Sequence, residues 1–332
     1  MKIDPTLRAL ADMTRLRIMR LLAHMELAVG ELAQVLGQSQ PRVSRHVRIL
    51  CDAGLAERRK EGSWVFLRSA IGENRAPPLG AAAARLLAVA ERDDAQFSAR
   101  CAEDRRHLAA IRAAREASAE NYFARHAAEW DTLRSLHTPD APVEAALAAA
   151  LGDGGLGDLL DVGTGTGRMA HLFAPRARHV TAFDKSPDML RLARTRLQDL
   201  PADQVELVQG DFTALPFGDG AFDTLLFHQV LHYAQAPEVV LAEAARVTRP
   251  GGTVALVDFA AHDREDLRTS HAHARLGFSD EQMLALLSNA GFEAAPPVAL
   301  PGKPLTVKIW TARRTAAPHP AHKRATAQEH RS

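Results

Sequence analysis

The order of apolar and polar positions divides the chain into four regions. Residues 1–70 show short helical patterns followed by a stretch in which apolar and polar residues alternate. Residues 76–135 are rich in Ala, Arg and Glu, with almost no Gly or Pro after Gly80, which is typical of long helices. Residues 156–312 alternate short apolar runs with helical patterns and predict βαβ units with a parallel sheet. Residues 316–332 lack apolar periodicity, and we expect a disordered basic tail.

The stretch SQPRVSRHVRIL, residues 39–50, predicts a helix with one apolar face and one basic face. At 100° per residue its apolar positions fall on a single stripe, formed by Val43, Val47 and Leu50. Its arginines point away from this stripe or lie on its flank, namely Arg42, Arg45 and Arg48. Ser39 is a plausible N-cap for this helix. The basic face is therefore left for solvent or for a partner.

The segments on either side of this helix complete a pattern. ELAVGELAQVLGQ, residues 26–38, predicts a short amphipathic helix that ends at Gly37, a residue suited to a left-handed C-cap. LAERRKEGSWVFLRS, residues 55–69, alternates and turns at Lys60-Glu61-Gly62, which predicts a β-hairpin. A helix, a Gly-containing turn and a second helix with outward arginines form the helix-turn-helix pattern, here followed by a wing.

Length and charge narrow the class of protein. A chain of 332 residues predicts two or three domains, and 46% hydrophobic with 24% charged residues is ordinary for a soluble globular protein. The net charge is only +1, yet residues 1–68 hold 12 Lys and Arg against 7 Asp and Glu, which favours a polyanionic partner for this end. With two cysteines, no signal peptide and no run of 18 apolar residues, we expect a cytoplasmic protein without a membrane partner.

Taken together, the elements of residues 4–70 resemble the winged-helix domain of ArsR/SmtB-type transcriptional repressors, including the run SRHVRILCDAGL after the turn. The resemblance implies a homodimer that binds double-stranded operator DNA. It also implies a helix after the wing that packs against its two-fold mate, for which the candidate residues are Leu86, Leu87, Val89 and Ala90. The DNA contacts that it suggests are Gln40, Arg42, Ser44, Arg45, Arg48, Arg59 and Lys60.

The metal site of many ArsR-type sensors is not expected here. Those proteins carry ELCVC in the helix before the recognition helix, where two thiolates bind soft metals. The corresponding residues of this chain read ELAVG, so Ala28 and Gly30 stand where the sulfurs would be. Cys51 cannot form a thiolate site alone. We therefore expect no metal ligands.

The run LLDVGTGTGRM, residues 159–169, predicts a strand, a glycine-rich turn and a helix, which is a nucleotide-binding arrangement. The dinucleotide fingerprint G-x-G-x-x-G/A fails, because its sixth position is Arg168. The pattern that fits is D-x-G-x-G-x-G, formed by Asp161, Gly163, Gly165 and Gly167.

That pattern resembles motif I of class I S-adenosylmethionine (SAM) methyltransferases, and four further motifs follow in order. The resemblance is closest to the menaquinone/ubiquinone-biosynthesis type and covers about residues 120–312. It implies a Rossmann-like α/β domain with a mostly parallel seven-stranded sheet, and SAM or S-adenosylhomocysteine (SAH) as cofactor. Asp184 would bind the ribose hydroxyls, Asp211 the adenine amino group, and Phe212 would flank the ring. The implied cofactor-binding residues are Asp161, Gly163, Gly165, Gly167, Asp184, Lys185, Asp211, Phe212, Tyr122 and Trp130.

Two points remain open at the level of sequence. Tyr122 and Trp130 either form a lid over the cofactor or only fix their helix to the next domain. His228, His232 and Tyr233 follow the fourth strand, where acceptor-facing groups tend to lie, but each can equally be structural. Because a general base is needed only for some methyl acceptors, the sequence names no catalytic residue.

The expected organisation has four parts. These are a winged helix-turn-helix domain (1–75), a helical linker or dimerisation region with a possible lid (76–135), a methyltransferase domain (136–315) and a tail (316–332). Two functions compete: a transcriptional regulator that senses SAM or SAH, and a methyltransferase on a small molecule with an accessory DNA-binding domain. A DNA-modifying enzyme is disfavoured, because the fourth strand reads FHQV where amino-methylating DNA enzymes carry [ND]-P-P-[YF].

Overall fold

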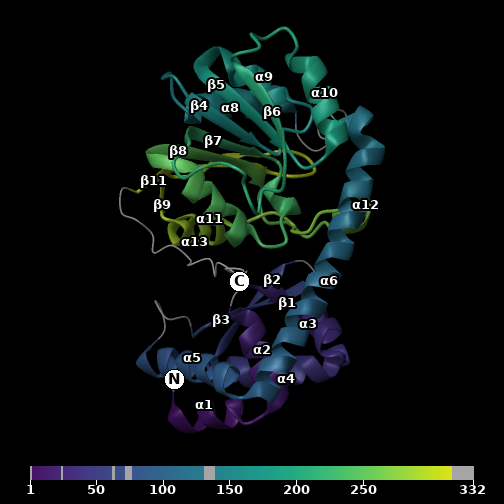
Figure 1. Ribbon diagram of the computed structural model, residues 1–332, viewed down its shortest axis with the longest axis vertical. Coiled ribbons are helices and arrows are strands. Elements are labelled where there is room, and N and C mark those ends of the chain that lie inside the picture. The colour runs from purple at the N-terminus through teal and green to yellow at the C-terminus, as the bar shows by residue number, and fades with distance from the viewer. Residues whose placement is uncertain (1, 24, 62–63, 72–76, 131–138, 316–332) are drawn as a thin grey trace, which may run out of the picture. The chain divides into compact units, whose positions relative to one another are not determined.

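The computed structural model describes residues 2–23, 25–61, 64–71, 77–130 and 139–315 (Figure 1). The predicted tail, 316–332, lies outside these residues. The chain divides into two compact units. The first consists of Met1–Glu129, His232–Ala236 and Phe259–Phe278, and the second of Trp130–Leu231, Pro237–Asp258 and Ser279–Ser332. None of the described helices combines the length and the apolar character that a bilayer crossing requires.

The first unit begins with a winged helix-turn-helix, as the sequence predicts. Its elements are α1 (Ile3–Leu10), α2 (Met13–Leu22), β1 (Leu27–Ala28), α3 (Val29–Leu36), α4 (Gln40–Asp52), β2 (Ala56–Glu61) and β3 (Trp64–Ser69). The three strands form an antiparallel sheet in the order β1-β3-β2, with Glu61 opposite Trp64 at the tip of the wing. The predicted helix-turn-helix and its hairpin wing are therefore confirmed.

Local sequence explains where these helices begin and end. Asp12 caps α2 by accepting a hydrogen bond from the backbone N–H of Arg15. Gly37 ends α3 in the left-handed conformation, at φ 61°, which a residue with a Cβ atom rarely adopts. Ser39 is the N-cap residue of α4, as predicted, although its side chain accepts no capping hydrogen bond.

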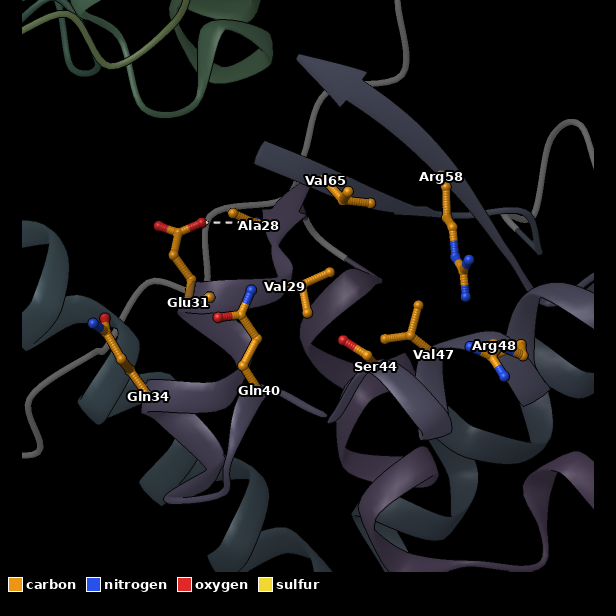
Figure 2. Close-up of a pocket in the computed structure, with 11 residues that line it drawn as sticks. Ala28, Val29, Glu31, Gln34, Gln40, Ser44, Val47, Arg48, Arg58 and Val65 are labelled. Atoms are coloured by element: carbon orange, nitrogen blue, oxygen red, sulfur yellow. Dashed lines mark hydrogen bonds between the residues drawn. The ribbon is translucent and has the colours of Figure 1, made fainter. Parts of the chain in front are cut away.

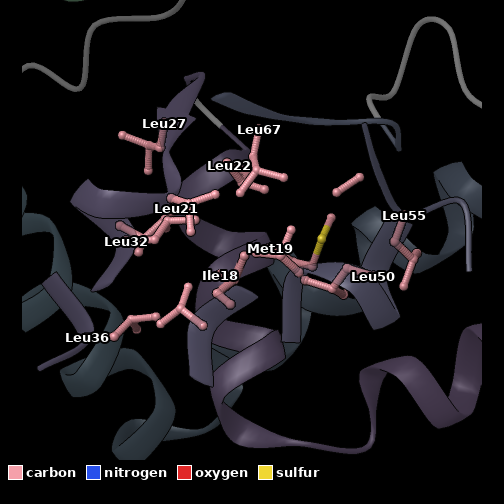
Figure 3. Close-up of a cluster of buried hydrophobic side chains, with 14 of the residues drawn as sticks. Ile18, Met19, Leu21, Leu22, Leu27, Leu32, Leu36, Leu50, Leu55 and Leu67 are labelled. Atoms are coloured by element: carbon pink, nitrogen blue, oxygen red, sulfur yellow. The ribbon is translucent and has the colours of Figure 1, made fainter. Parts of the chain in front are cut away.

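The core of this unit lies between the helices and the wing (Figure 3). The predicted stripe on α4 is confirmed, because Val43, Val47 and Leu50 are all buried. They join Ile18 and Leu67, which are also fully buried, in one apolar cluster. Each such side chain stabilises the fold by about 1.5–3 kcal/mol relative to exposure in water. The apolar stripe thus fixes α4 on the unit and leaves its arginines outside.

Two further helices complete the core of the first unit, α5 (Pro78–Asp93) and α6 (Ala95–His126). Leu87 of α5 and Leu108 of α6 are buried in the same cluster as the winged helix. Parts of α5 and α6 therefore share one core with the winged helix. Leu87 is also unavailable for a two-fold contact, whereas Leu86 and Val89 are exposed.

The second unit is an α/β domain. Its strands are β4 (Gly157–Val162), β5 (Ala177–Asp184), β6 (Val205–Gln209), β7 (Phe222–His228), β8 (Thr248–Phe259), β9 (Phe292–Ala294), β10 (Val298–Leu300) and β11 (Val307–Arg314). Its helices are α8 (Asp140–Ala150), α9 (Arg168–Phe173), α10 (Pro187–Leu197), α11 (Pro237–Val247) and α13 (Asp280–Ala290). Two short helical segments follow β7 and β8, η3 (Leu231–Tyr233) and α12 (Asp266–Ser270).

The sheet has the order β10-β11-β8-β7-β4-β5-β6, and β9 also pairs with β11. Strands β6, β5, β4, β7 and β8 run parallel to one another, whereas β9 and β10 each pair antiparallel with β11. The mostly parallel sheet is confirmed, but the described residues form eight strands rather than seven, because two short segments replace one strand beside β11. Figure 1 shows α9 and α10 on one side of the sheet and α11 and α13 on the other.

The order of strands sets the position of the glycine-rich loop. β4 lies in the middle of the parallel part, between β5 and β7. Leu159, Leu160 and Val162 are fully buried, as a strand covered on both faces requires. Because the chain continues from β4 to a helix on one side of the sheet and from β7 to a helix on the other, the loop after β4 lies at the switch point, where open α/β sheets bind ligands.

Candidate functional site

The loop between β4 and α9 needs its glycines for two different reasons. Gly163, Gly165 and Gly167 all have left-handed backbone conformations, at φ 69°, 55° and 79°. A Cβ atom at Gly163 would overlap the side chain of Val230, and one at Gly167 would lie 3.0 Å from Cβ of Ala193. A Cβ atom at Gly165 would meet only Trp130, at 3.6 Å from its Nε1 atom. The outer two glycines therefore allow close packing, while Gly165 lies beside an aromatic side chain.

Asp161 is buried directly below this loop. Its Oδ2 atom accepts hydrogen bonds from Oγ1 of Thr164, at 2.6 Å, and from the backbone N–H of Ala170, at 3.0 Å. Its Oδ1 atom is buried and has no hydrogen-bond partner among the described residues. Burial raises the pKa of this carboxyl group to about 6, although the two hydrogen bonds oppose the shift. The acid thus fixes the loop and keeps one oxygen available for a donor.

Asp184 ends β5 and lies against the same loop. Its Oδ2 atom accepts the backbone N–H of Gly165, at 2.9 Å, and its Oδ1 atom accepts that of Ser186, at 2.8 Å. Burial raises the pKa of the Asp184 carboxyl group, and hydrogen bonds from the backbone limit the rise. Two acids that were selected from different sequence motifs, Asp161 and Asp184, are therefore brought to one loop.

The next strand adds a third acid. Asp211 follows β6, and its Oδ2 atom lies 3.0 Å from Nζ of Lys185, which follows β5. Its Oδ1 atom accepts hydrogen bonds from the backbone N–H and the hydroxyl group of Thr213. Phe212 is half-buried beside it. The structure therefore joins Lys185 and Asp211 in an ion pair at the carboxyl ends of neighbouring parallel strands.

The two aromatic lid candidates differ in their positions. Trp130 belongs to the unit that holds the glycine-rich loop and lies beside Gly165. Tyr122 belongs to the first unit, where its ring lies 4.4 Å from that of His126. Burial raises the pKa of Tyr122. Trp130 is thus placed at the loop.

The segments after β7 and β8 bring several ring side chains together. His228 is the last residue of β7, and His232 and Tyr233 follow it. The buried ring of His232 lies 4.0 Å from that of Tyr233 and 4.2 Å from that of His273. The sequence analysis did not select His273, because nothing local distinguishes it from other histidines of the segment that follows β8.

Gln229, directly after His228, is a further residue that sequence reasoning missed. It is buried, and its backbone is left-handed at φ 54°, a conformation that is uncommon for a residue with a side chain. Its N–H donates to the carbonyl oxygen of Val257, at 2.7 Å. Such backbone conformations cost about 1–3 kcal/mol and occur preferentially at functional sites. No feature of the sequence could reveal this strain.

The basic face of α4 differs from the rest of the winged helix in its charge pairing. Most arginines of this domain have a carboxylate partner, in the pairs Arg8–Asp4, Arg15–Asp12, Arg17–Asp104, Arg20–Glu91, Arg59–Glu26 and Arg68–Glu57. Within the described residues, the arginines of this domain that have no carboxylate partner are Arg42, Arg45, Arg48 and Arg58. All four are exposed and lie on α4 or β2. The uncompensated positive charge is therefore concentrated on α4 and the wing.

Arg59, one of the predicted DNA contacts, forms an ion pair within this unit. Arg59 donates from Nε and Nη2 to the two carboxylate oxygens of Glu26, at 3.1 and 2.9 Å, and its guanidinium lies 5.0 Å from the ring centre of Phe66. Arg58 is exposed instead. Alternation along β2 places residues 58 and 60 on one face and residue 59 on the other, so this signal was present in the sequence.

Comparisons with known proteins agree with the description of both the winged helix-turn-helix and the α/β domain. Residues 12–58 match the family described as "Bacterial regulatory protein, arsR family", and residues 160–256 match the family described as "Methyltransferase domain". An uncharacterized 37.1 kDa protein in transposon TN4556 of Streptomyces fradiae is 37% identical over 148 residues, which are 41% of this chain and 42% of that protein.

Two methyltransferases are also similar to parts of this chain. A demethylmenaquinone methyltransferase of Renibacterium salmoninarum is 37% identical over 101 residues, 30% of this chain and 40% of the enzyme. A crystal structure of the Burkholderia thailandensis 1,6-didemethyltoxoflavin-N1-methyltransferase, with bound 1,6-didemethyltoxoflavin and S-adenosylhomocysteine, is 24% identical. It covers 60% of this chain and 89% of that one, with a TM-score of 0.47.

The matches to these two sequence relatives span about two fifths of the relatives' own length. The part of this chain that is shared with methyltransferases contains the glycine-rich loop and the acids at the ends of β4, β5 and β6. The part that is shared with regulators contains α3, α4 and the first residues of the wing. The chain therefore joins an ArsR-family helix-turn-helix domain to a methyltransferase domain.

Proposed function

We propose that the chain is a DNA-binding transcriptional regulator of the repressor type, and that its methyltransferase domain binds SAM or SAH as the sensed ligand. The observation that carries the DNA-binding part is the charge distribution on the winged helix. Among the residues that the structure describes, arginines elsewhere in this domain pair with carboxylates, whereas those of α4 and Arg58 do not. Unpaired arginines on an exposed helix face favour the phosphates and guanine edges of DNA.

The proposed DNA contacts lie on α4 and on the outer face of β2. Gln40 and Ser44 supply hydrogen-bonding groups one helical turn apart, and their neighbours on α4 supply charge. Lys60 shares the outer face of β2 with Arg58, which takes the place of Arg59 in this set. Recognition helices of this kind lie in the major groove and bind as dimers to two half-sites about 10 base pairs apart, centre to centre.

A homodimer is part of the proposal, and exposed apolar side chains support it. Ile3 and Leu7 are one turn apart on α1, and Leu86 and Val89 are one turn apart on α5. All four are exposed in the single chain. Large apolar side chains grouped on helix faces are typical of interaction surfaces. We assign these two faces to the contact with a second copy of the chain.

The residues around the glycine-rich loop fit SAM. Among the described residues, Oδ1 of Asp161 is a buried acceptor without a hydrogen-bond partner, and we place the ammonium group or the sulfonium centre of SAM beside it. We place the ribose hydroxyls at Asp184, and the adenine at the next strand end, beside the pair of Lys185 and Asp211. Trp130 lies beside Gly165, and we assign to it the exclusion of water from the loop. When bound, SAM supplies an electrophilic methyl group.

The second candidate function is methyl transfer to a small molecule. It is favoured by the rings of His232, Tyr233 and His273, which meet where η3, after β7, lies beside the segment that follows α12. A demethylmenaquinone methyltransferase is 37% identical to this chain over 101 residues. In-line displacement on a sulfonium needs mainly the positioning of the acceptor, which ring side chains can provide.

One experiment separates the two functions. Operator sequences are first selected from random duplex DNA with the full-length protein. A labelled operator is then titrated at fixed salt without ligand, with SAM and with SAH. A sensor shows a 5- to 150-fold shift in operator affinity, the usual range of such coupling, and the operator must change cofactor affinity by the same factor. Identical curves, together with SAH release in the presence of a small aromatic acceptor, would support the enzyme instead.

A further inference from the structure

A pocket of about 420 Å³ lies within the winged helix, between α3, α4 and the two strands of the wing (Figure 2). Its apolar wall is formed by Val29, Val47 and Val65. Arg48 and Arg58 line it from α4 and β2. The volume falls in the range of small-molecule sites. This pocket belongs to one compact unit and is separate from the glycine-rich loop.

The charge in the pocket is unbalanced. Figure 2 shows the side chain of Arg58 pointing from β2 toward Arg48 on α4, while Glu31 points the other way, toward Ala28. Oε2 of Glu31 accepts the backbone N–H of Ala28, at 2.9 Å, which engages this acid with the start of α3. Neither arginine has a carboxylate partner among the described residues. Two cations against one engaged acid leave a net charge of +1 and a local attraction for anions.

Small residues at two positions keep the pocket open. Ala28 and Gly30 lie in its lining. A Cβ atom placed on Gly30 would meet no heavy atom within 4 Å, so a side chain at this position would project into empty space. The backbone of Gly30 is not left-handed, and glycine is therefore not required there for conformational reasons. The space exists because this chain carries almost no side chain at these positions.

We infer that this pocket binds a small amphipathic anion, with its carboxylate or phosphate head between Arg48 and Arg58 and its apolar body against the three valines. Guanidinium groups bind such heads through paired, charge-assisted hydrogen bonds. Gln40 and Ser44, which also line the pocket, provide further polar contacts. The occupant is thus a metabolite with one acidic head and an apolar body.

Binding of the anion would also regulate DNA binding, a consequence that rests on the proposed function. Gln40, Ser44 and Arg48 are among the proposed DNA contacts, so an anion in this pocket and operator DNA compete for the same groups. By mass action, an anion present at ten times its dissociation constant would weaken apparent operator affinity about 11-fold. The pocket would then act as a second input, independent of the cofactor.

The test uses 2-naphthoate as the probe and the full-length protein without DNA. Acetate carries the charge without the ring, and 2-naphthamide carries the ring without the charge, all at matched ionic strength. Calorimetry should show binding of 2-naphthoate at least about tenfold tighter than that of either control, since one charge-assisted hydrogen bond alone accounts for a factor of this size. Equal binding of all three compounds, or of none, would overturn the inference.

Substitutions of residues that line the pocket test whether 2-naphthoate binds there. Arg48→Gln and Arg58→Gln should each weaken 2-naphthoate binding about tenfold or more, and Gly30→Leu should abolish it by filling the pocket. Arg45→Gln is the matched control, because Arg45 is an exposed arginine of the same helix that does not line the pocket. Thermal unfolding confirms that each variant is folded. Equal losses in the Arg45 and Arg48 variants, or full binding by a folded Gly30→Leu variant, would contradict the site.

Titration of the protein with 2-naphthoate, and of the operator in the presence of 2-naphthoate, distinguishes this inference from the proposed function. A protein that binds 2-naphthoate but no DNA supports the pocket and refutes the regulator. A protein whose operator binding is insensitive to 2-naphthoate, and which shows no direct binding of the probe, refutes the pocket and leaves the regulator intact.

Discussion

Arg17 on α2 and Asp104 on α6 form a two-pronged ion pair between helices that are far apart in the sequence. Nε of Arg17 donates to Oδ2 of Asp104 at 2.8 Å, and Nη2 donates to Oδ1. The side chain of Asp104 is only 1% exposed. The hydrogen bonds with Asp104 raise the pKa of Arg17, although burial opposes this. This pair ties the long helix α6 to the winged helix.

Removal of one partner should therefore be costly. Asp104→Ala leaves a guanidinium that is largely buried and unpaired, and we expect it to lower the free energy of unfolding of this unit by about 3–5 kcal/mol. Urea unfolding followed by circular dichroism measures the change. Glu57→Ala is the control, because it breaks an exposed pair with Arg68 and should cost at most about 1 kcal/mol. Equal losses of unfolding free energy in both variants would show that the buried pair stabilises the fold no more than the exposed pair does.

The fold was largely predictable because its main signals are local. Gly37 ends a helix through its own backbone freedom, and Val43 and Val47 face inward through helical periodicity alone. The pairing of Arg17 with Asp104 was not predictable, because it joins residues 87 positions apart. The packing of α5 and α6 was not predictable for the same reason. Their helical pattern was visible, but the burial of Leu87 against the winged helix depends on tertiary packing.

In the candidate site, too, some features have a signal in the sequence and others depend on the folded structure. Asp161 was found in the glycine-rich sequence pattern and Asp184 through the resemblance to methyltransferases. The neighbouring parallel strands β4 and β5 then bring the two acids together. Arg59 was selected for its charge, and only strand alternation, applied strictly, would have pointed to Arg58. The left-handed backbone of Gln229 has no counterpart in residue type, since a non-glycine residue in that conformation is held there by its surroundings.

The raised pKa of Asp161 predicts a dependence of stability on pH. The folded protein holds this proton with a pKa of about 6, above the ordinary value of 3.8, so the folded state binds more protons than the unfolded state between these values. The free energy of unfolding therefore falls as pH rises from about 4 to about 6, by about 3 kcal/mol for a shift of this size.

Asp161→Asn should remove this loss, because the amide oxygen can still accept from Thr164 and Ala170. Relative to the unsubstituted protein, the variant should gain about 3 kcal/mol between pH 4 and pH 7. Urea unfolding at pH 4, 5, 6 and 7 measures the difference. A difference that is constant across this range would mean that Asp161 is not buried as a proton-binding acid.

Asp184→Ala should weaken SAM binding. Each hydrogen bond from a ribose hydroxyl to a charged acceptor contributes about 1.5–3 kcal/mol, so loss of both should reduce affinity at least tenfold. Calorimetry measures this, with Asp199→Ala as the control because Asp199 is an exposed acid after α10. NADH should not bind at micromolar concentrations, because the loop lacks the dinucleotide fingerprint. Unchanged SAM affinity in the Asp184 variant would remove this residue from the site.

Arg45 and Arg59 should behave in opposite ways. Arg45→Ala should weaken operator binding by about 1–3 kcal/mol if Arg45 reads a guanine, with relaxed preference at one base pair. If Arg45 contacts a phosphate, the loss should be similar on all sequences, and the slope of log K against log salt should become shallower by about 0.9. Arg59→Gln should mainly lower stability, since it breaks the pair with Glu26. Anisotropy titrations at several salt concentrations, together with thermal unfolding, test both variants, and a larger DNA defect in Arg59→Gln would contradict the assignment.

The exposed apolar faces of α1 and α5 predict how the chain assembles. Leu86 is 56% exposed and Leu7 is 54% exposed, although both are large apolar side chains. Leu86→Asp places a charge in the proposed interface, where an unpaired ion is strongly unfavourable, and should convert dimer to monomer without unfolding the chain. Sedimentation velocity across a range of concentrations measures this, with Leu284→Asp as the control because Leu284 is partly exposed on α13 of the other unit. Since one protomer contacts only one half-site, the Leu86 variant should also lose most of its operator affinity while keeping its SAM affinity. A Leu86→Asp protein that sediments as the unsubstituted chain does would exclude this face from the dimer.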